Sequence, residues 1–523
     1  MAMDRRAFLA GTAGLAATAW LPLGCASWVP GGSVLFQHGV ASGDPLSDRV
    51  ILWTRVSPEP GVTAVDVRWE IAEDPDFKHL VGKGRVRTDV SRDLTVKVDA
   101  VGLAPGEHWF YRFEALGQRS PVGRTRTLPV GAVDHVRFAV CSCSNYPQGY
   151  FNAYAAMALR EDIDAVLHLG DYIYEYGADG YGGDAGLGRD VEPRHEITSL
   201  DDYRTRYAQY RSDPDLQALH RLHPFIVVWD DHESANDSWS AGAQNHQPER
   251  EGDWVARKAA AVRAYFEWMP IRAVPGSLRA GRIHRSFRYG DLVDLIMLDT
   301  RLTGRDRQVS GQDVSGLEDP ARTLLGREQE AWLAGELERS QADGTAWRVL
   351  GQQVMLGQMV PPGLPSHNDG WDGYRAARAR LLRDLDRTNI RDVIALTGDY
   401  HSSWAMEITD DPFSDAAYDP VTGRGVRAVE FIAPAVSSSP LGSSPRLAGR
   451  FDGITETHPH VRLCDVEQNG YFMLDLDRER ARADWFWQRT VREPGVDEVF
   501  GAAWATERGR PQLVAQAPSA VVG

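Results

Sequence analysis

The chain has 523 residues, of which 43% are hydrophobic and 25% are charged, and its formal net charge is −16. This length predicts two or three domains with a large hydrophobic core, and the acidic balance argues against a polyanionic nucleic acid as partner. The net charge does not exclude a phosphorylated substrate, because bound cations can reverse the local field of an acidic site.

Residues 1–28 predict an export signal. Arg5 and Arg6 precede an apolar run, rich in Ala and Gly, that continues to about Gly24, and this is the order of a signal peptide. The start of the segment resembles a twin-arginine signal, which would carry a folded, metal-loaded protein. A short membrane anchor is the alternative, although the run is short for a membrane span. We therefore expect a periplasmic or secreted protein that meets the twin-arginine export machinery. Cys25 is a candidate site for a lipid anchor.

Residues 34–128 predict a small all-β domain. The segments 50–55, 65–70, 95–98 and 108–115 alternate in polarity or run apolar, and turn residues separate them. This pattern is typical of an immunoglobulin- or fibronectin-like sandwich.

Residues 133–508 predict an α/β domain, because strands here alternate with helices. The expected strands are 136–140, 164–169, 224–229, 291–298, 347–350, 393–396, 426–433 and 471–476, and the expected helices are 150–161, 200–220, 254–268, 327–342 and 374–386. Residues 178–197 predict a long active-site loop. Residues 509–523 predict a frayed C-terminal tail.

Polar groups that can bind metals follow five of these strands. They are Cys143, Asp171 with Tyr174, Asp231 with His232 and Asn236, Asp299 with Arg301, and Asp399 with His401. Because ligands bind outside the carboxyl ends of strands in layered α/β folds, we expect these groups to meet at one edge. One Asp-X-His pair occurs often by chance, but five such groups in register predict a multi-metal centre.

The donor types restrict which metals can bind. Asp171 and Asp399 are hard oxygen donors suited to Ca²⁺, Mg²⁺ or Mn²⁺. A Tyr174 phenolate and a Cys143 thiolate need a strong Lewis acid, which favours ferric iron or zinc. Such a centre can polarise a phosphoryl group, and Arg301 could clamp its oxygens.

Several of these residues have a structural alternative. Cys143 could be a small buried hydrophobe, Asn236 a helix cap, Asp230 a cap or ion-pair partner beside the ligand Asp231, and Arg301 a partner of Asp299. His232 is a candidate proton donor to the leaving group, and a purely structural role is its alternative.

Six segments resemble the alkaline phosphatase D family, or PhoD-like phosphatases. They are GVASGDP (39–45), CSNY (143–146), LGDYIYE (169–175), WDDHE (229–233), LDTR (298–301) and GDYH (398–401). The resemblance implies a sandwich domain followed by a metallophosphoesterase domain, which is an α/β/β/α sandwich of two mixed sheets. It also implies a ferric ion with Ca²⁺ ions at the active site.

Carried over to this sequence, the resemblance implies roles for individual residues. Cys143, Asp171 and Tyr174 would hold iron, and Asp171, Asp231 or Asn236, Asp399 and His401 would serve the iron and calcium sites. The motifs depart from those of the wider metallophosphoesterases, because Cys143, Asp231 and Asp399 stand where an Asp-X-His motif, an Asn and a His are usual. These departures disfavour Zn²⁺ and Mn²⁺ centres.

The sequence thus predicts an exported metal-dependent phosphoesterase, which hydrolyses phosphate monoesters, diesters or both through a metal-activated hydroxide at an iron/calcium centre. A phosphodiesterase of phospholipase-D-type specificity is the alternative within the fold. A non-catalytic exported binding protein and an iron redox protein are the alternatives from other classes.

Overall fold

The computed structural model describes residues 34–183, 186–273, 281–310, 312–361, 363–364, 368–447 and 449–518. The expected export signal and Cys25 lie outside these residues, as do the last five residues of the expected tail. Within the described part, no helix has the length and apolar character to cross a membrane.

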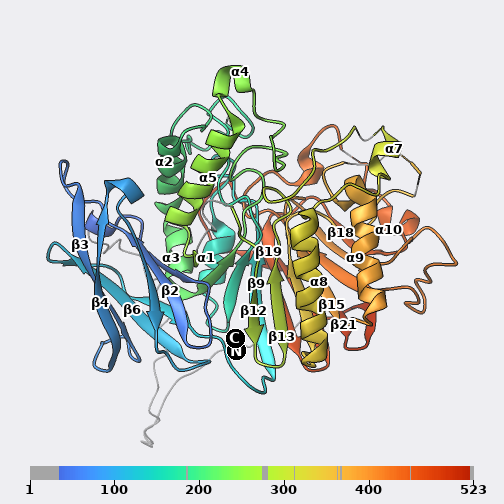
Figure 1. Ribbon diagram of the computed structural model, residues 1–523, viewed down its shortest axis with the longest axis horizontal. Helices are drawn as coiled ribbons and strands as arrows, with labels where there is room; N and C mark the ends of the chain where they lie inside the picture. The colour runs from blue at the N-terminus through green and yellow to red at the C-terminus, as the bar shows by residue number, and fades with distance from the viewer. Residues whose placement is uncertain are drawn as a thin grey trace, which may run out of the picture. The chain divides into compact units, whose positions relative to one another are not determined.

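Two mixed β-sheets form the centre of the fold (Figure 1). The larger has the order β22 (Arg510–Ala515), β21 (Glu498–Glu507), β20 (Arg480–Gln488), β19 (Gly470–Asp477), β9 (His135–Cys141), β10 (Ala165–His168), β11 (Pro224–Val227), β1 (Val40–Gly43), β2 (Arg49–Arg55) and β5 (Thr95–Val101). The smaller has the order β12 (Arg285–Tyr289), β13 (Val293–Met297), β14 (Trp347–Gly351), β15 (Val393–Thr397), β17 (Ala428–Ile432), β16 (Ser403–Ile408) and β18 (Val461–Asp465).

The two sheets pack face to face, and helices cover their outer faces. Along β13, Val293, Leu295 and Met297 join the core shared with the larger sheet, whereas Ile296 and Leu298 join a second core under the helices. This alternation follows from the two-residue period of a strand. Strands buried on both faces must be apolar throughout, which explains why the expected strands read as continuous hydrophobic runs.

The helices lie in two groups on opposite sides of the sheets in Figure 1. One group is α1 (Asn152–Ala158), α2 (Leu200–Arg211), α3 (Pro214–Leu222), α4 (Pro248–Glu251) and α5 (Trp254–Trp268); the other includes α7 (Val314–Leu317), α8 (Gly326–Ala342), α9 (Arg375–Arg387) and α10 (Ile454–Thr457). Four 3₁₀ turns complete the elements of the described residues: η1 (Val34–Phe36), η2 (Val90–Arg92), η3 (Trp371–Tyr374) and η4 (Leu441–Ser443). The expected α/β/β/α architecture is confirmed.

The N-terminal all-β domain is also confirmed, but it is not a closed sandwich of its own. Its outer sheet contains β4 (Leu80–Asp89), β3 (Ala64–Ala72), β6 (His108–Ala115), β7 (Gln118–Arg119) and β8 (Gly123–Arg126). Its inner sheet, formed by β1, β2 and β5, continues the large catalytic sheet through the parallel pair β1–β11. A shared sheet leaves no exposed edge between the two domains.

Two expectations are corrected by the structure. The helix expected over 200–220 is two helices, because Asp213 caps a new one with its carboxylate on the amides of Asp215 and Leu216, and Pro214 opens it. The expected frayed tail contains β22, whose Leu513 is buried and which pairs with β21.

Candidate metal centre

The groups that follow the strands meet at one end of both sheets. Among the residues that the structure describes, three overlapping sets can each present ligand atoms within 4.8 Å of one another: Cys143, Asp171 and His401; Asp171, Asp231 and His232; and Asp230, Asp231 and Asp399. Asp171 belongs to two of the sets, and Asp231 also belongs to two. The convergence expected from strand topology is therefore present, and Asp171 lies where it could bridge two ions.

The backbone of this region is strained at the ligand positions. Cys143, Asp171, Asp399 and His401 have φ angles of 62°, 55°, 60° and 48°, in the left-handed region that residues other than Gly seldom adopt. Conformations of this kind each cost about 1–3 kcal/mol and cluster at functional sites. The fold thus holds four candidate ligands in conformations that their local sequence disfavours.

Gly170 brings the Asp171 loop against the next strand. Its φ is +106°, and a Cβ placed on it would lie 2.4 Å from the Cβ of Asp230. No larger residue fits at this point, so the glycine two residues after β10 is required for the close approach of Asp171 and Asp230.

Tyr174 and His401 face Asp171 across the centre. The Tyr174 hydroxyl donates to Oδ2 of Asp171 at 3.0 Å, lies 3.1 Å from Nε2 of His401, and accepts from Ser438 at 2.7 Å. Nδ1 of His401 lies 3.0 Å from the carbonyl of Ser439. A carbonyl only accepts, so Nδ1 carries a proton, and Nε2 is the ring nitrogen that faces Tyr174.

Three buried carboxylate oxygens indicate that this pocket is built for cations. Oδ1 of Asp171, Oδ2 of Asp230 and Oδ1 of Asp231 are buried without a hydrogen-bond partner among the described residues. The Asp231 oxygen lies 3.5 Å from Nη2 of Arg301. An unsatisfied buried carboxylate is costly, and metal ions would remove that cost.

The thiol of Cys143 and the phenol of Tyr174 also indicate a cation site. Burial and the nearby Asp171 carboxylate raise the pKa of Cys143 and the pKa of Tyr174 well above their usual values. Both groups are thus neutral at ordinary pH unless a cation stabilises their anions. A set of carboxylates, a thiol, a phenol and an imidazole fits a metal centre.

His232 is positioned as a charged group beside the centre. Its Nδ1 lies 2.7 Å from Oε2 of Glu175, and its ring stacks on Tyr174 at a centroid distance of 4.3 Å. Burial lowers its pKa, but the carboxylates of Glu175, Asp171 and Asp231 outweigh burial and raise the pKa well above its usual value. The imidazole can therefore hold a proton at Nε2.

Arg301 does not lie where it could clamp a substrate phosphate. Its side chain is fully buried, and its Nε, Nη1 and Nη2 donate to Asp230, Asp369 and Asp399 respectively. Its pairing partner is not Asp299, whose carboxylate instead accepts from the backbone amides of residues 301 and 302. Arg301 is the counter-ion of the carboxylate cluster.

Two family models match the chain: PhoD-like phosphatase over residues 138–485, and the N-terminal domain of PhoD-like phosphatases over residues 25–129. The chain belongs to the PhoD-like phosphatase family. Alkaline phosphatase D of Bacillus subtilis (strain 168) is 38% identical over 499 residues, which cover 91% of this chain and 82% of that protein. The solved structure of PhoD matches with a TM-score of 0.83 and 36% identity, over 94% of each chain. This PhoD-like phosphatase is therefore a hydrolase of phosphoric esters, and the expected family is confirmed.

Asn236 is the least constrained of the candidate ligands in this PhoD-like phosphatase. No helix starts there, so the helix-cap alternative fails. Its backbone amide donates to Glu175 at 2.8 Å, and its side-chain amide donates to Gln244 at 3.0 Å. The side chain is half-buried and stays a candidate for the calcium site.

Sequence reasoning assigned no role to three residues that organise the centre. Glu233 accepts from the amides of Asp171, Tyr172 and Asp230 at 2.7–3.0 Å and so ties the β10 and β11 loops together. Glu175 holds His232, and Asp369 holds Arg301. Glu233 lies inside the WDDHE motif and Glu175 inside the LGDYIYE motif, so these motifs could have revealed both residues. Asp369 follows no strand and offers no comparable signal.

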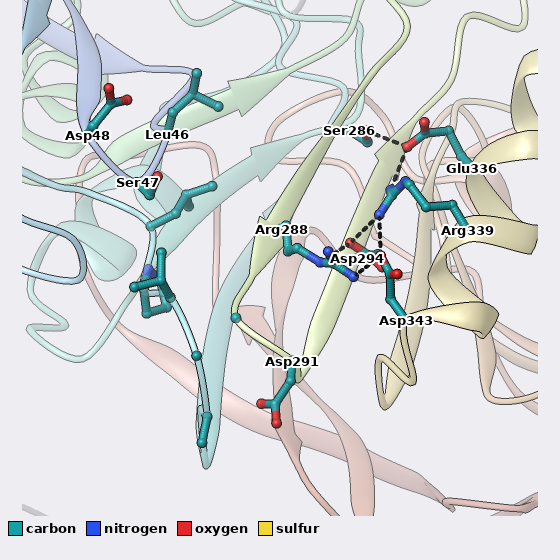
Figure 2. A pocket seen from close by; sticks show the side chains of 16 residues that line it. Leu46, Ser47, Asp48, Ser286, Arg288, Asp291, Asp294, Glu336, Arg339 and Asp343 are labelled. Atoms are coloured by element: carbon teal, nitrogen blue, oxygen red, sulfur yellow. Dashed lines mark hydrogen bonds and ion pairs between the residues drawn. The ribbon is translucent and has the colours of Figure 1, made fainter.

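The centre opens into a cavity of about 660 Å³ whose lining includes Asp237, Asp369, Asp399 and His401. A larger cavity, of about 940 Å³, is shown in Figure 2 and contains none of the strand-end ligands. Its charged side chains pair with one another across β12, β13 and α8: Arg288 donates to Asp343 and Arg339 donates to Glu336, each at 2.7 Å. The candidate metal centre therefore adjoins the smaller cavity.

Proposed function

We propose that this enzyme is an exported phosphoesterase that hydrolyses phosphate monoesters, diesters or both at a centre of ferric iron and Ca²⁺. The observation that carries the metal assignment is the set of three buried carboxylate oxygens without hydrogen-bond partners among the described residues. They lie beside a thiol and a phenol that need a strong Lewis acid to ionise.

The candidate ligands can be assigned to ferric iron or to Ca²⁺ by the chemistry of their donor atoms. Cys143, Asp171 and Tyr174 would hold iron, because a soft thiolate and a phenolate suit Fe³⁺ better than Ca²⁺. Asp231, Asn236, Asp399 and His401 would complete the iron and calcium sites, with Asp171 shared. Bound there, the ions would polarise the phosphoryl group, lower the pKa of the attacking water and offset charge on the leaving oxygen.

The protein's own groups supply orientation and a proton. Glu175 fixes Nδ1 of His232, and His232 lies in one candidate ligand set with Asp171 and Asp231. Its Nε2–H would therefore be available to protonate the leaving oxygen of an ester bound there. Arg301 holds Asp230, Asp369 and Asp399 in place. The candidate ligands therefore stay arranged before substrate arrives.

Metal content and ester hydrolysis, measured on the same purified protein, test this proposal. We expect iron and calcium in the protein and hydrolysis of p-nitrophenyl phosphate, of its bis-ester, or of both. Faster turnover of the bis-ester would favour a phosphodiesterase of phospholipase-D-type specificity. Absence of metal and of hydrolysis would contradict the proposal and favour a binding protein. Activity lost with EDTA and restored by Ca²⁺ alone would argue against redox chemistry.

The proposed location is the periplasm or the exterior, reached through the twin-arginine pathway. Arg5-Arg6 and the apolar run after them support it. Replacing both arginines by Lys should leave the enzyme in the cytoplasmic fraction, and labelling with a fatty-acid probe, compared with a Cys25→Ala variant, tests the lipid anchor.

A further inference from the structure

The cavity at the metal centre is lined by charged and by apolar side chains. The charged set includes Asp237, Asp369, Asp399 and His401, and Gln312, Tyr400, Arg450 and His458 also line the cavity. Six apolar residues, which we call the apolar wall, complete the lining: Met359, Val360, Leu441, Leu447, Phe451 and Ile454. At about 660 Å³ the cavity is far larger than a phosphate group, and it lies in the range of sites that bind drug-sized organic molecules.

Three residues of the apolar wall, Met359, Phe451 and Ile454, belong to or pack on one hydrophobic cluster. Trp404, Met406 and Ile432 are fully buried within this cluster, whereas Met359 and Phe451 pack on it and remain partly exposed. Apolar surface left next to a highly charged centre is unfavourable in water. Such surface is removed from water if the bound ester carries an apolar group.

The backbone fixes this wall relative to the metal ligands. The amide of Leu441 donates to the carbonyl of His401 at 3.2 Å. The amide of Met359 donates to Asp372 at 2.8 Å, and its carbonyl lies 3.0 Å from Nε2 of His458. Leu441 of the apolar wall is thus tied to the candidate ligand His401, and Met359 is tied to Asp372 and His458.

We propose that this wall is a specificity site for a bulky apolar organic group, an alkyl chain or an aromatic ring, carried by the phosphate ester. The inference rests on the proposed function, because the ester's phosphate must lie at the metal centre. The continuity of the apolar wall with the ligand His401 places the organic group beside the phosphate. Phosphate esters of small polar alcohols would leave the wall uncovered and bind more weakly.

A chain-length series tests the inference. The metal-loaded enzyme is assayed with ethyl, butyl, hexyl and octyl phosphates, by phosphate release, and with the matching alkyl p-nitrophenyl diesters. Intrinsic reactivity barely changes along each series, so differences report binding. For each of the two substrate series that the enzyme hydrolyses, we expect kcat/KM to rise about twofold to fourfold per added methylene group until the apolar wall is covered. Most of this rise should come from a lower KM.

Substitutions in the apolar wall test whether its residues cause the dependence of kcat/KM on chain length. Leu447→Ser and Phe451→Ser should each lower the octyl-to-ethyl ratio of kcat/KM severalfold. This ratio is independent of the fraction of folded enzyme, so it stands even though Phe451 packs on Trp404 at 5.6 Å. The matched control is Leu159→Ser, a leucine that is 70% exposed and absent from the cavity lining, and it should keep the wild-type ratio.

The outcomes separate the two proposals. Equal kcat/KM for ethyl and octyl esters, or a chain-length effect that survives both wall substitutions, overturns the specificity site and leaves the phosphoesterase intact. Failure of the metal-loaded enzyme to hydrolyse any ester in either series overturns the proposed function and the specificity site together.

Discussion

The hydroxyl of Tyr174 donates a 3.0 Å hydrogen bond to Oδ2 of Asp171, three residues earlier in the chain, while Oδ1 of the same carboxylate has no hydrogen-bond partner among the described residues. The turn that joins them starts at Gly170 and places Asp171 in a left-handed conformation. One oxygen of this carboxylate therefore contacts the candidate iron ligand Tyr174, and the other is available to a second cation.

Asp171→Asn should remove bound metal and activity together. An amide keeps the size of the side chain but loses the charge that two ions would share, so we expect metal content to fall below stoichiometry and kcat/KM to drop by at least about 100-fold. Metal analysis and p-nitrophenyl ester hydrolysis on one preparation measure both quantities. Asp201→Asn, at a side chain that is 90% exposed, is the matched control. Full metal content and activity in Asp171→Asn would refute the site assignment.

Much of this site could be predicted because strand ends are visible in sequence. β9, β10, β11, β13 and β15 are short apolar runs, and parallel pairing within each of the two sheets brings the carboxyl ends of its strands to one edge of that sheet. That reasoning placed Cys143, Asp171, Asp231 and Asp399 without any contact information.

The parts of the site that could not be predicted depend on contacts between segments far apart in the chain. Asp369 meets Arg301 from a loop 68 positions away, and no local pattern reports such a pairing. The expected phosphate clamp at Arg301 failed for the same reason, because a sequence cannot show that its guanidinium is surrounded by carboxylates. The sequence did not predict β12, β16, β18, β20 or β21, because polar residues interrupt the apolar pattern of these strands.

Arg301→Met should act on the metal centre and on stability rather than on phosphate binding. Removing the guanidinium leaves Asp230 and Asp399 without the arginine that pairs with them, while Asp369 keeps its ion pair with Arg305. Breaking a buried pair of this kind costs about 3–5 kcal/mol, which urea denaturation of the metal-free protein can measure. A phosphate clamp would instead raise KM strongly at constant metal content, and that result would contradict the structural role.

Asp369→Asn removes one carboxylate partner of Arg301 and leaves its ion pairs with Asp230 and Asp399 in place. Nη1 of Arg301 lies 2.8–2.9 Å from both oxygens of Asp369. We expect metal affinity to fall about 10–100-fold, read from metal titration of the apo-enzyme, with kcat restored at saturating metal. Unchanged metal affinity would show that Asp369 does not position the ligands.

His232→Gln should slow the hydrolysis of esters with poor leaving groups. A positioned general acid contributes about 10²–10⁴-fold, and p-nitrophenolate needs little protonation. We therefore expect kcat to fall strongly for alkyl phosphates and much less for p-nitrophenyl phosphate. Equal losses on both substrates would indicate a structural role, and Glu175→Gln should reproduce part of the selective effect because Glu175 holds the ring.

Acid should unfold the protein partly through histidines that are buried in neutral form. Burial lowers the pKa of His38, of His223 and of His460 from 6.5 to about 3. Between pH 6.5 and 3 the unfolded chain binds protons that the folded chain does not, so stability falls as pH falls. The upper bound is about 2 kcal/mol per histidine at pH 5. Urea denaturation at pH 7 and pH 5 tests this loss, and a His223→Gln variant should lose less. The same pH dependence in wild type and variant would contradict the assignment.

Gly170→Ala tests whether the turn itself positions the ligands. The added Cβ would lie 2.4 Å from the Cβ of Asp230, at a φ of +106° that Ala disfavours, so the loops of Asp171 and Asp230 must separate. We expect lost metal affinity and a thermal stability lower by several degrees. Gly335→Ala, in the interior of α8 with no atom within 4 Å of the added Cβ, should instead stabilise the protein by about 0.5–1 kcal/mol. If Gly170→Ala binds metal like the wild type, the close approach of the two loops is not what holds Asp171 in place.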